Sequence, residues 1–241
     1  MGKTREVAAV VMVAGLLVGV AARAQAYDAV EVKDGGTISG TVKFAGAPPA
    51  RKALEVTKDK EVCGKEKHQS LDLIVGSDKG IENAVIRLVD ISKGKKWAST
   101  QAVLDQKGCI YKPHVVVVPA GGDLKILNSD GILHNIHTYS KLNASINKAQ
   151  PKFKKELTEK FTKPEVIKVT CDAHAWMSGW VIVSDHPYVA VTDEKGAFSL
   201  KDVPAGKYKV EIWHETLGKS EKTVTLKPKE EAKLNIELAK K

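Results

Sequence analysis

The motifs that this sequence lacks exclude several classes of function. Its 241 residues contain no Cys-x-x-Cys-His segment, so covalent attachment of a c-type haem is not indicated. It has no glycine-rich phosphate loop and no pairing of a nucleophile with a base, so no enzyme activity is predicted. Aromatic residues make up only 5% of the chain and are not interleaved with the basic residues, so nucleic-acid binding is not expected.

Long apolar runs are also scarce, and the one at the N-terminus has the features of a secretion signal. A basic start precedes an apolar run from Val7 to Ala22, and Ala24-Gln25-Ala26 is a small-x-small cleavage site. An uncleaved anchor is the alternative, but the run is short for a membrane span. Residues 1–26 are therefore predicted to be a signal peptide. The mature protein is expected to start near Tyr27, to be periplasmic or extracellular, and not to span the membrane.

Short alternating segments bounded by turn residues follow, and they predict an all-β fold. Strands at this spacing are typical of a β-sandwich or barrel. Two polar stretches, residues 50–70 and 92–108, are expected to be loops. The predicted strands before residue 185 cover residues 36–44, 71–75, 84–89, 114–118, 124–128, 165–170 and 180–183.

One short turn between two of these strands combines sulfur and imidazole side chains. Cys171, His174 and Met177 follow one another at intervals of three residues. Two histidines, one cysteine and a weakly bound methionine form the ligand set of blue-copper sites, since soft sulfur and imidazole suit copper. The second histidine has a candidate upstream, in the segment Leu133-His134-Asn135-Ile136-His137.

The pattern Cys-x-x-His-x-x-Met-x-Gly before an apolar strand resembles the ligand loop of small cupredoxins of the amicyanin and plastocyanin type. The upstream His-Asn-x-His also resembles their first-ligand segment, and the resemblance covers about residues 113–185. It implies a Greek-key β-sandwich in which His134, Cys171, His174 and Met177 hold one type 1 copper ion. Alanines flank His174, where amicyanin has prolines. This difference leaves open how stiff the loop is, and therefore what redox potential the copper site would have.

The same resemblance assigns roles to neighbouring residues. Asn135 would tie the two ligand segments together, and His137 would not be a ligand. The chemical rival is tetrahedral zinc, bound by His134, His137, Cys171 and His174, with Met177 as core packing. A His-x-x-His spacing along a strand points the two rings to opposite faces, which disfavours the zinc set.

The segment 141–165 is ambiguous. Phe153, Leu157 and Phe161 lie at a helical spacing of four residues, and prolines bracket them. Residues 156–161 resemble the strand that precedes the ligand strand in cupredoxins, and on that resemblance we favour a strand.

The cysteine count is odd. In an oxidising compartment two of three cysteines are expected to pair. If Cys171 binds a metal, Cys63 and Cys109 form the disulfide, which would stabilise the fold by about 3–4 kcal/mol. Two unpaired, buried thiols are the alternative.

A second unit begins near residue 186. Residues 190–200 and 203–213 alternate between apolar and polar, with Glu-Lys-Gly and Pro-Ala-Gly turns. Residues 187–238 are similar to the carboxypeptidase regulatory-like family, a transthyretin-like β-sandwich without catalytic residues. We therefore divide the chain into a cupredoxin-like copper domain with an N-terminal β extension, 27–185, and a smaller C-terminal β-sandwich, 186–241. The strand at residues 36–44 also looks like the start of that second family, so the copper domain is alternatively an insertion.

The remaining histidines and Trp176 are assigned simple roles. His114 is interpreted as a structural histidine, with contact to a metal or a haem edge as the alternative. His68, His186 and His214 are expected at the surface or in turns. Trp176 would shield the metal from water or belong to a docking patch.

The resemblance implies an exported, non-enzymatic carrier of one electron. A copper delivery or storage protein, or a cell-envelope binding module with a structural metal, is the alternative. The formal net charge of +9 becomes about +7 without the signal peptide, with 35 basic and 28 acidic residues. This charge suits a redox partner protein with an acidic docking surface, and solubility alone also explains it.

Overall fold

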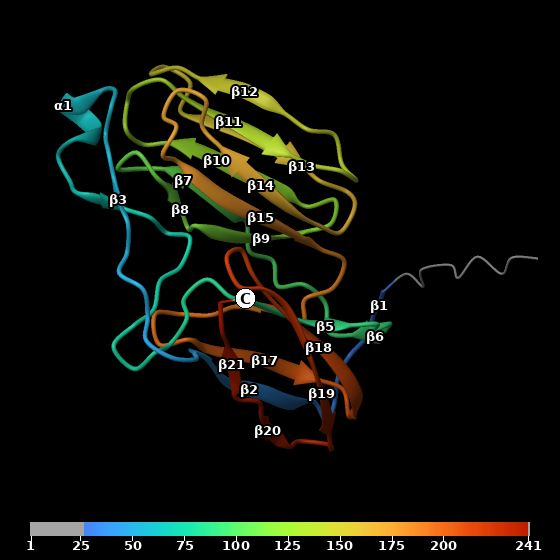
Figure 1. Cartoon of the computed structure of the whole chain (residues 1–241). Helices are drawn as coiled ribbons and strands as arrows, with labels where there is room; N and C mark the ends of the chain where they lie inside the picture. Colours follow the sequence, from blue (N-terminus) through green and yellow to red (C-terminus); the bar gives the residue numbers. More distant parts are fainter. Residues whose placement is uncertain (1–26, 241) are drawn as a thin grey trace, which may run out of the picture.

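Two β-sandwiches stacked end to end make up the computed structural model, which describes residues 27–240 (Figure 1). The predicted signal peptide lies outside the described residues. The prediction of an all-β fold with one β-sandwich and a second, smaller β-sandwich is confirmed. Among residues 27–240, no helix is long and apolar enough to cross a membrane.

The larger sandwich carries the candidate ligands and consists of a four-stranded and a five-stranded sheet. Inward-facing side chains alternate with outward-facing ones, so that Leu124 and Ile126 of one sheet meet Ile167 and Val169 of the other in one buried cluster. Each such side chain contributes roughly 1.5–3 kcal/mol on burial. The strand order of the four-stranded sheet is β13 (Glu156–Lys160), β10 (Asp123–Asn128), β7 (Ala102–Gln106), β8 (Tyr111–Lys112). The strand order of the five-stranded sheet is β12 (Asn147–Gln150), β11 (His134–Tyr139), β14 (Glu165–Thr170), β15 (Ser178–Ser184), β9 (Val115–Pro119).

The smaller sandwich draws strands from both ends of the chain. Strands β2 and β5 come before the larger sandwich in the sequence, yet they pair with C-terminal strands. The strand order of one sheet is β16 (Val189–Val191), β5 (Val85–Val89), β18 (Gly206–His214), β19 (Gly218–Leu226). The strand order of the other sheet is β17 (Ala197–Val203), β2 (Gly36–Phe44), β20 (Glu231–Lys233), and β21 (Ile236–Leu238) also pairs with β2.

This topology corrects the sequence-based division at residue 185. The copper domain was given residues 27–185, but residues 36–44 and 85–89 share a core with the C-terminal strands. Strands β2 and β5 are inner strands of the two sheets. Without them, the C-terminal strands would leave their apolar faces uncovered. The larger sandwich is therefore inserted between β5 and β16, as the insertion alternative expects.

A small apolar cluster joins the two sandwiches. Val115 and Ile182 of the larger sandwich pack with Val85 and Trp213 of the smaller one. The rings of Trp180 and Trp213 meet edge to face with centroids 4.9 Å apart. His114 lies beside this cluster, where its Nε2 contacts the Glu215 carboxylate. His114 is thus a buried structural histidine at the interface of the two units.

Local differences from the sequence predictions concern the inner strand β7 and several short elements. The stretch 92–108, predicted to be a loop, contains β7 and the short β6 (Lys93–Gly94), which pairs with β1 (Asp28–Ala29). The stretch 50–70, also predicted to be a loop, contains β3 (Ala53–Leu54), α1 (Lys60–Cys63) and β4 (His68–Gln69). Residues 71–75 form no strand and make only an isolated bridge from Val75 to Ile81. Within 141–165, β12 and β13 confirm the strand interpretation, because tertiary pairing overrides the helical spacing.

Candidate metal centre

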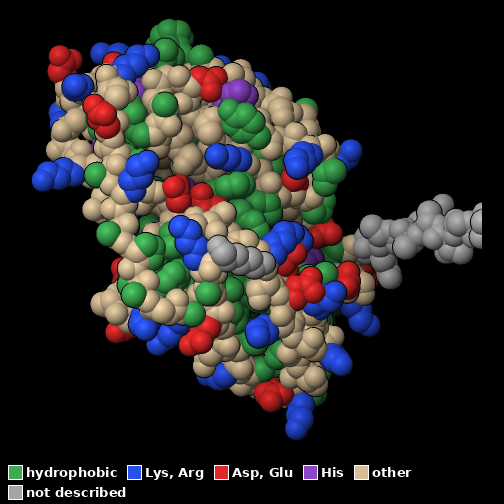
Figure 2. Space-filling model, in the orientation of Figure 1, with side chains coloured by type: hydrophobic (Ala, Val, Ile, Leu, Met, Phe, Trp, Pro, Cys, Tyr) green, Lys and Arg blue, Asp and Glu red, His purple; other side chains and the backbone are tan. Residues whose placement is uncertain are grey.

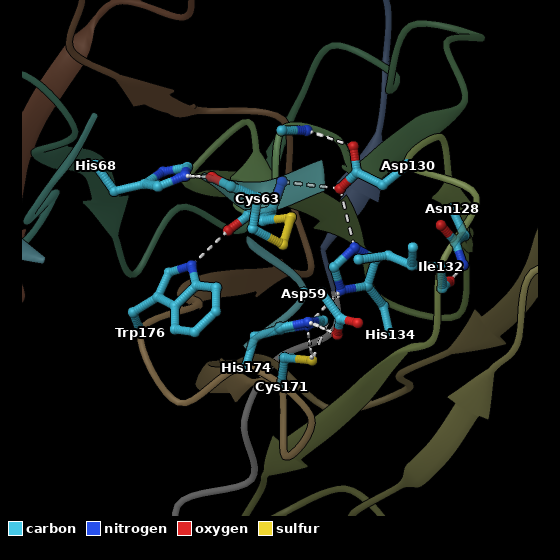
Figure 3. Close-up of a disulfide and its surroundings, with 12 residues drawn as sticks. Asp59, Cys63, His68, Asn128, Asp130, Ile132, His134, Cys171, His174 and Trp176 are labelled. Atoms are coloured by element: carbon cyan, nitrogen blue, oxygen red, sulfur yellow. Dashed lines mark hydrogen bonds and ion pairs between the residues drawn. A yellow bond between two sulfur atoms is a disulfide. The ribbon is translucent and has the colours of Figure 1, made fainter. Parts of the chain in front are cut away.

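Strand pairing brings the ligand segments together at one end of the larger sandwich. His134 begins β11, while Cys171 follows the last residue of the neighbouring β14. The turn from Cys171 to Met177 is closed by two backbone hydrogen bonds. The Met177 N–H donates to the His174 carbonyl (3.0 Å), and the Cys171 N–H donates to the Met177 carbonyl (3.3 Å). This turn folds His174 back toward His134 (Figure 3).

Three donor atoms converge in the interior. The Nδ1 atoms of His134 and His174 are 3.0 Å apart, and the Cys171 Sγ lies 3.9 and 3.7 Å from them. All three side chains are at most 2% exposed. Metal–nitrogen bonds of about 2.0 Å and a metal–sulfur bond of about 2.3 Å place such donors roughly 3–4 Å apart. The spacing therefore fits one ion held by two imidazoles and one thiolate.

A carboxylate holds the far nitrogen of each imidazole (Figure 3). His134 Nε2 lies 2.9 Å from Asp130, and His174 Nε2 lies 2.8 Å from Asp59. A hydrogen bond to a carboxylate keeps Nε2 protonated and leaves the Nδ1 lone pair directed at the centre. When both imidazoles are neutral in this form, two lone pairs and a thiolate face one another, an arrangement that a bound cation stabilises. The donor set therefore fits a soft metal ion such as copper.

The local electrostatics favour the thiolate form of Cys171. Burial by itself would raise the pKa of the Cys171 thiol, but hydrogen bonds from His134, His174 and the Asn135 N–H lower it to about 6. Burial would lower the pKa of His134, but its hydrogen bonds to Asp130 and Cys171 raise it to about 8. These contacts favour the thiolate, which is the form that binds a metal ion.

The loops around the site are tied together by polar contacts. The side-chain oxygen of Asn135 accepts a hydrogen bond from the Asp172 N–H, so Asn135 joins the two ligand segments as the resemblance implies. The N–H groups of Gly108 and Cys109 donate to Asp130 at 2.6 and 2.8 Å and fix the carboxylate that holds His134.

The structure brings together three of the four predicted ligands. Met177 is 1% exposed and packs in the same apolar cluster as Cys171, and its axial role stays a prediction. His137 lies on the other face of β11, partly exposed, with its Nδ1 3.0 Å from Asp172. The four-residue zinc set is therefore not assembled among the described residues, in agreement with the alternation along a strand.

A disulfide joins Cys63 and Cys109 with a Cα–Cα distance of 5.4 Å, and Cys171 is free and buried. Trp176 donates its indole N–H to the Cys109 carbonyl at 3.1 Å, and its ring centroid lies 5.0 Å from that of His174. The indole therefore packs beside the His174 imidazole, and its shielding of a metal from water stays a prediction.

Sequence reasoning missed two residues of the site, and three histidines are more buried than it predicted. Asp130 precedes His134 by four residues, and this short spacing could have suggested a contact between the two side chains. Asp59 lies 115 residues from its partner His174, so the sequence gave no indication of that contact. His68, His186 and His214 were expected at the surface or in turns, but their side chains are buried. Each ring has a hydrogen-bond partner that offsets the cost of burial: a backbone carbonyl for His68 and His186, and a backbone N–H for His214.

Neither a protein-family model nor a curated protein matches the sequence. Similar solved structures include an amicyanin mutant with Cu(I), 21% identical over 37% of this chain and 87% of its own, with a TM-score of 0.32. A purple cupredoxin from Nitrosopumilus maritimus is 23% identical over 35% of this chain and 100% of its own, with a TM-score of 0.30. A copper-containing nitrite reductase from Thermus scotoductus SA-01 is 17% identical over 41% of this chain and 25% of its own, with a TM-score of 0.33.

Proposed function

We propose that this protein is an exported type 1 copper protein that carries one electron between redox partners. The observation that supports it best is the buried convergence of His134 Nδ1, His174 Nδ1 and Cys171 Sγ. A bound copper ion would supply the ability to accept and release one electron within a fixed ligand cage. Met177 is proposed as the weak axial ligand.

The protein's contribution to electron transfer is to hold the ligands still. Asp130 and Asp59 fix the orientation of the two imidazoles, and the apolar cluster around Cys171 excludes water. With Met177 as fourth ligand no coordination position is left for a substrate, so we propose a carrier and not an enzyme. Delivery or storage of copper would call for easier exchange than fully buried donors permit.

The metal-bearing end of the larger sandwich offers a surface for the redox partner. Phe153 is 85% exposed in the loop that follows β12, whose last residue Gln150 pairs with His134. Lys152, Lys154 and Lys155 flank Phe153 and are exposed. An apolar centre with a basic rim suits a partner with an acidic docking surface. Elsewhere basic side chains are spread over the visible face of both sandwiches (Figure 2).

We further propose that the protein works outside the cytoplasm, in the periplasm or extracellularly. The Cys63–Cys109 disulfide supports an oxidising compartment. The smaller sandwich is proposed as a structural or docking module like the carboxypeptidase regulatory-like family, and it buries β9 and β15 of the copper-bearing unit at the shared interface.

Reversible redox chemistry of the purified, copper-loaded protein tests this function. We expect one copper ion per chain and an intense blue or green colour from the thiolate bond. A one-electron reductant should bleach the colour, and reoxidation should restore it. A colourless Cu(II) protein, or a copper ion that leaves on reduction, would contradict the carrier function.

A further inference from the structure

The candidate metal centre is covered by a segment that the ligand motif does not include. Residues 55–67 connect β3 and β4, which form a separate two-stranded antiparallel sheet, so the segment returns to where it began. We call residues 55–67 the capping segment. It carries Asp59, α1 and Cys63, and it contacts the ligand loop where Asp59 meets His174. With this contact in place, His174 is fully buried.

Asp59 is held in an unusual conformation at this contact. It precedes α1 with φ 50° and ψ 43°, the left-handed region that a residue other than glycine seldom adopts. Aspartate at this N-cap position ordinarily accepts a hydrogen bond from the backbone of its own helix. The Asp59 side chain makes no such bond and instead reaches His174 Nε2 at 2.8 Å. The local backbone thus gives up a stabilising cap, which indicates that the contact with His174 matters more.

The disulfide links the capping segment to the other carboxylate of the site. Cys63 lies at the end of α1, and its N–H donates to the Asp59 carbonyl at 2.8 Å. Its disulfide partner Cys109 donates its N–H to Asp130, which holds His134. A single covalent bond therefore fixes the supports of both imidazoles relative to each other (Figure 3).

We propose that Asp59 is a positioning residue for the ligand His174 and that the Cys63–Cys109 disulfide keeps it in place. Asp59 selects the His174 tautomer with Nε2 protonated, so that Nδ1 faces the centre. Its negative charge near the ligands also favours the more highly charged oxidation state of a bound copper ion and lowers the reduction potential. The effect on the potential rests on the proposed copper function, whereas the effect on the tautomer does not.

Metal-free protein labelled with ¹⁵N gives the first test. We expect His174 to show a protonated Nε2 in the wild type and in Asp59→Asn, whose amide oxygen still accepts the hydrogen bond. Asp59→Ala should give a mixture of tautomers and faster exchange of that proton. The disulfide-free variant, with Cys63→Ser and Cys109→Ser, should resemble Asp59→Ala if it folds. An unchanged His174 tautomer in Asp59→Ala would overturn the proposal, whatever metal the site binds.

Copper-loaded protein gives the second test, with Glu61→Gln as the matched control. Glu61 is an exposed acid two residues away on the same segment, with no hydrogen bond or ion pair among the described residues. Asp59→Asn should raise the reduction potential while Glu61→Gln changes it little. Asp59→Ala should also weaken copper binding by about 10–100-fold in competition with a chelator. Equal shifts for Asp59→Asn and Glu61→Gln would show a general charge effect and refute a specific effect of Asp59 on the potential. Loss of colour in the wild type would instead refute the copper function and leave the tautomer result standing.

Discussion

At the scale of single residues, the site depends on which nitrogen of each histidine faces inward. His134 and His174 both present Nδ1, and each Nε2 lies against a carboxylate. His137, only three residues from His134, points the other way and contacts Asp172. Residue type and spacing identify the candidate metal ligands. The face of the strand on which a histidine lies, and the carboxylate that contacts its Nε2, decide which candidates face the centre of the site.

The two histidines of β11 can be separated by mutation. His134→Ala should weaken copper binding by more than the roughly 10–100-fold that loss of an outer partner causes, because a ligand itself is removed. His137→Ala should leave copper affinity and colour unchanged, since its ring lies on the opposite face. Chelator competition with both variants measures this. Loss of the site in His137→Ala with tolerance of His134→Ala would show that the ligand is assigned to the wrong histidine.

Met177 sets the second prediction at this scale. Met177→Leu should keep copper bound and coloured, because the two histidines and Cys171 form the main ligand set. It should raise the reduction potential, since an electron-donating sulfur is replaced by an apolar side chain that disfavours the oxidised ion. Voltammetry of the two proteins checks the direction. An unchanged potential would place Met177 in the core and outside the ligand set.

At the scale of secondary-structure elements, β14 is anchored at both ends. Its C-terminal end leads into Cys171, and its first residue, Glu165, holds the loop after β11. Glu165 accepts hydrogen bonds from Ser140, from Asn143 and from the backbone of residues 141–143. Burial by itself would raise the pKa of Glu165, but these hydrogen bonds lower it to about 2.

This lowered pKa predicts a pH-dependent stability. The folded-state pKa of Glu165 lies below the ordinary value of 4.5, so its contribution is fully present above about pH 4.5 and is lost as pH falls toward 2. Glu165→Gln should reduce the free energy of unfolding at pH 7 by about 1–2 kcal/mol, and the difference should shrink below pH 4.5. Urea unfolding at several pH values measures it. Glu194→Gln, at an exposed turn residue without a side-chain partner among the described residues, is the control and should show no such trend.

Strong alternation made most central strands predictable, and the ligand turn was predictable from its spacing. The inner strand β7 was not predictable, because it lies in a polar stretch and is held by pairing with β10 and β8. The Asp59–His174 contact was also out of reach of a sequence argument, because a single acidic residue in a charged loop carries no periodic signal. Long-range pairing also explains why β2 belongs to the C-terminal sandwich.

At the scale of the whole molecule, the ligands and the proposed docking surface lie at the same end of the larger sandwich. The smaller sandwich packs against β9 and β15 through the cluster of Val85, Val115, Ile182 and Trp213. The chain passes through the smaller sandwich before and after the larger one, so both ends of the larger sandwich are attached to the smaller one. This arrangement leaves the loop of Lys152–Lys155 exposed at the surface.

The basic rim predicts charge-dependent electron transfer. Replacing Lys152, Lys154 and Lys155 by Gln should slow reduction of ferricyanide, an anionic oxidant, several-fold at low ionic strength, and the difference should vanish at high salt. Stopped-flow measurements of the copper-loaded protein test this. The same replacement at Lys207, Lys222 and Lys227 of the smaller sandwich, which are exposed and form no ion pair among the described residues, should have little effect. Equal slowing in both triple variants would show that net charge, and not this surface, governs the rate.

X-ray absorption spectroscopy at the copper edge is the most direct test of the central claim that His134, His174 and Cys171 hold one copper ion. We predict two nitrogen scatterers at about 2.0 Å and one sulfur scatterer at about 2.3 Å or less, and loss of that sulfur shell in Cys171→Ser. A first shell made only of nitrogen and oxygen in the wild type, or a sulfur shell that persists in Cys171→Ser, would contradict the account.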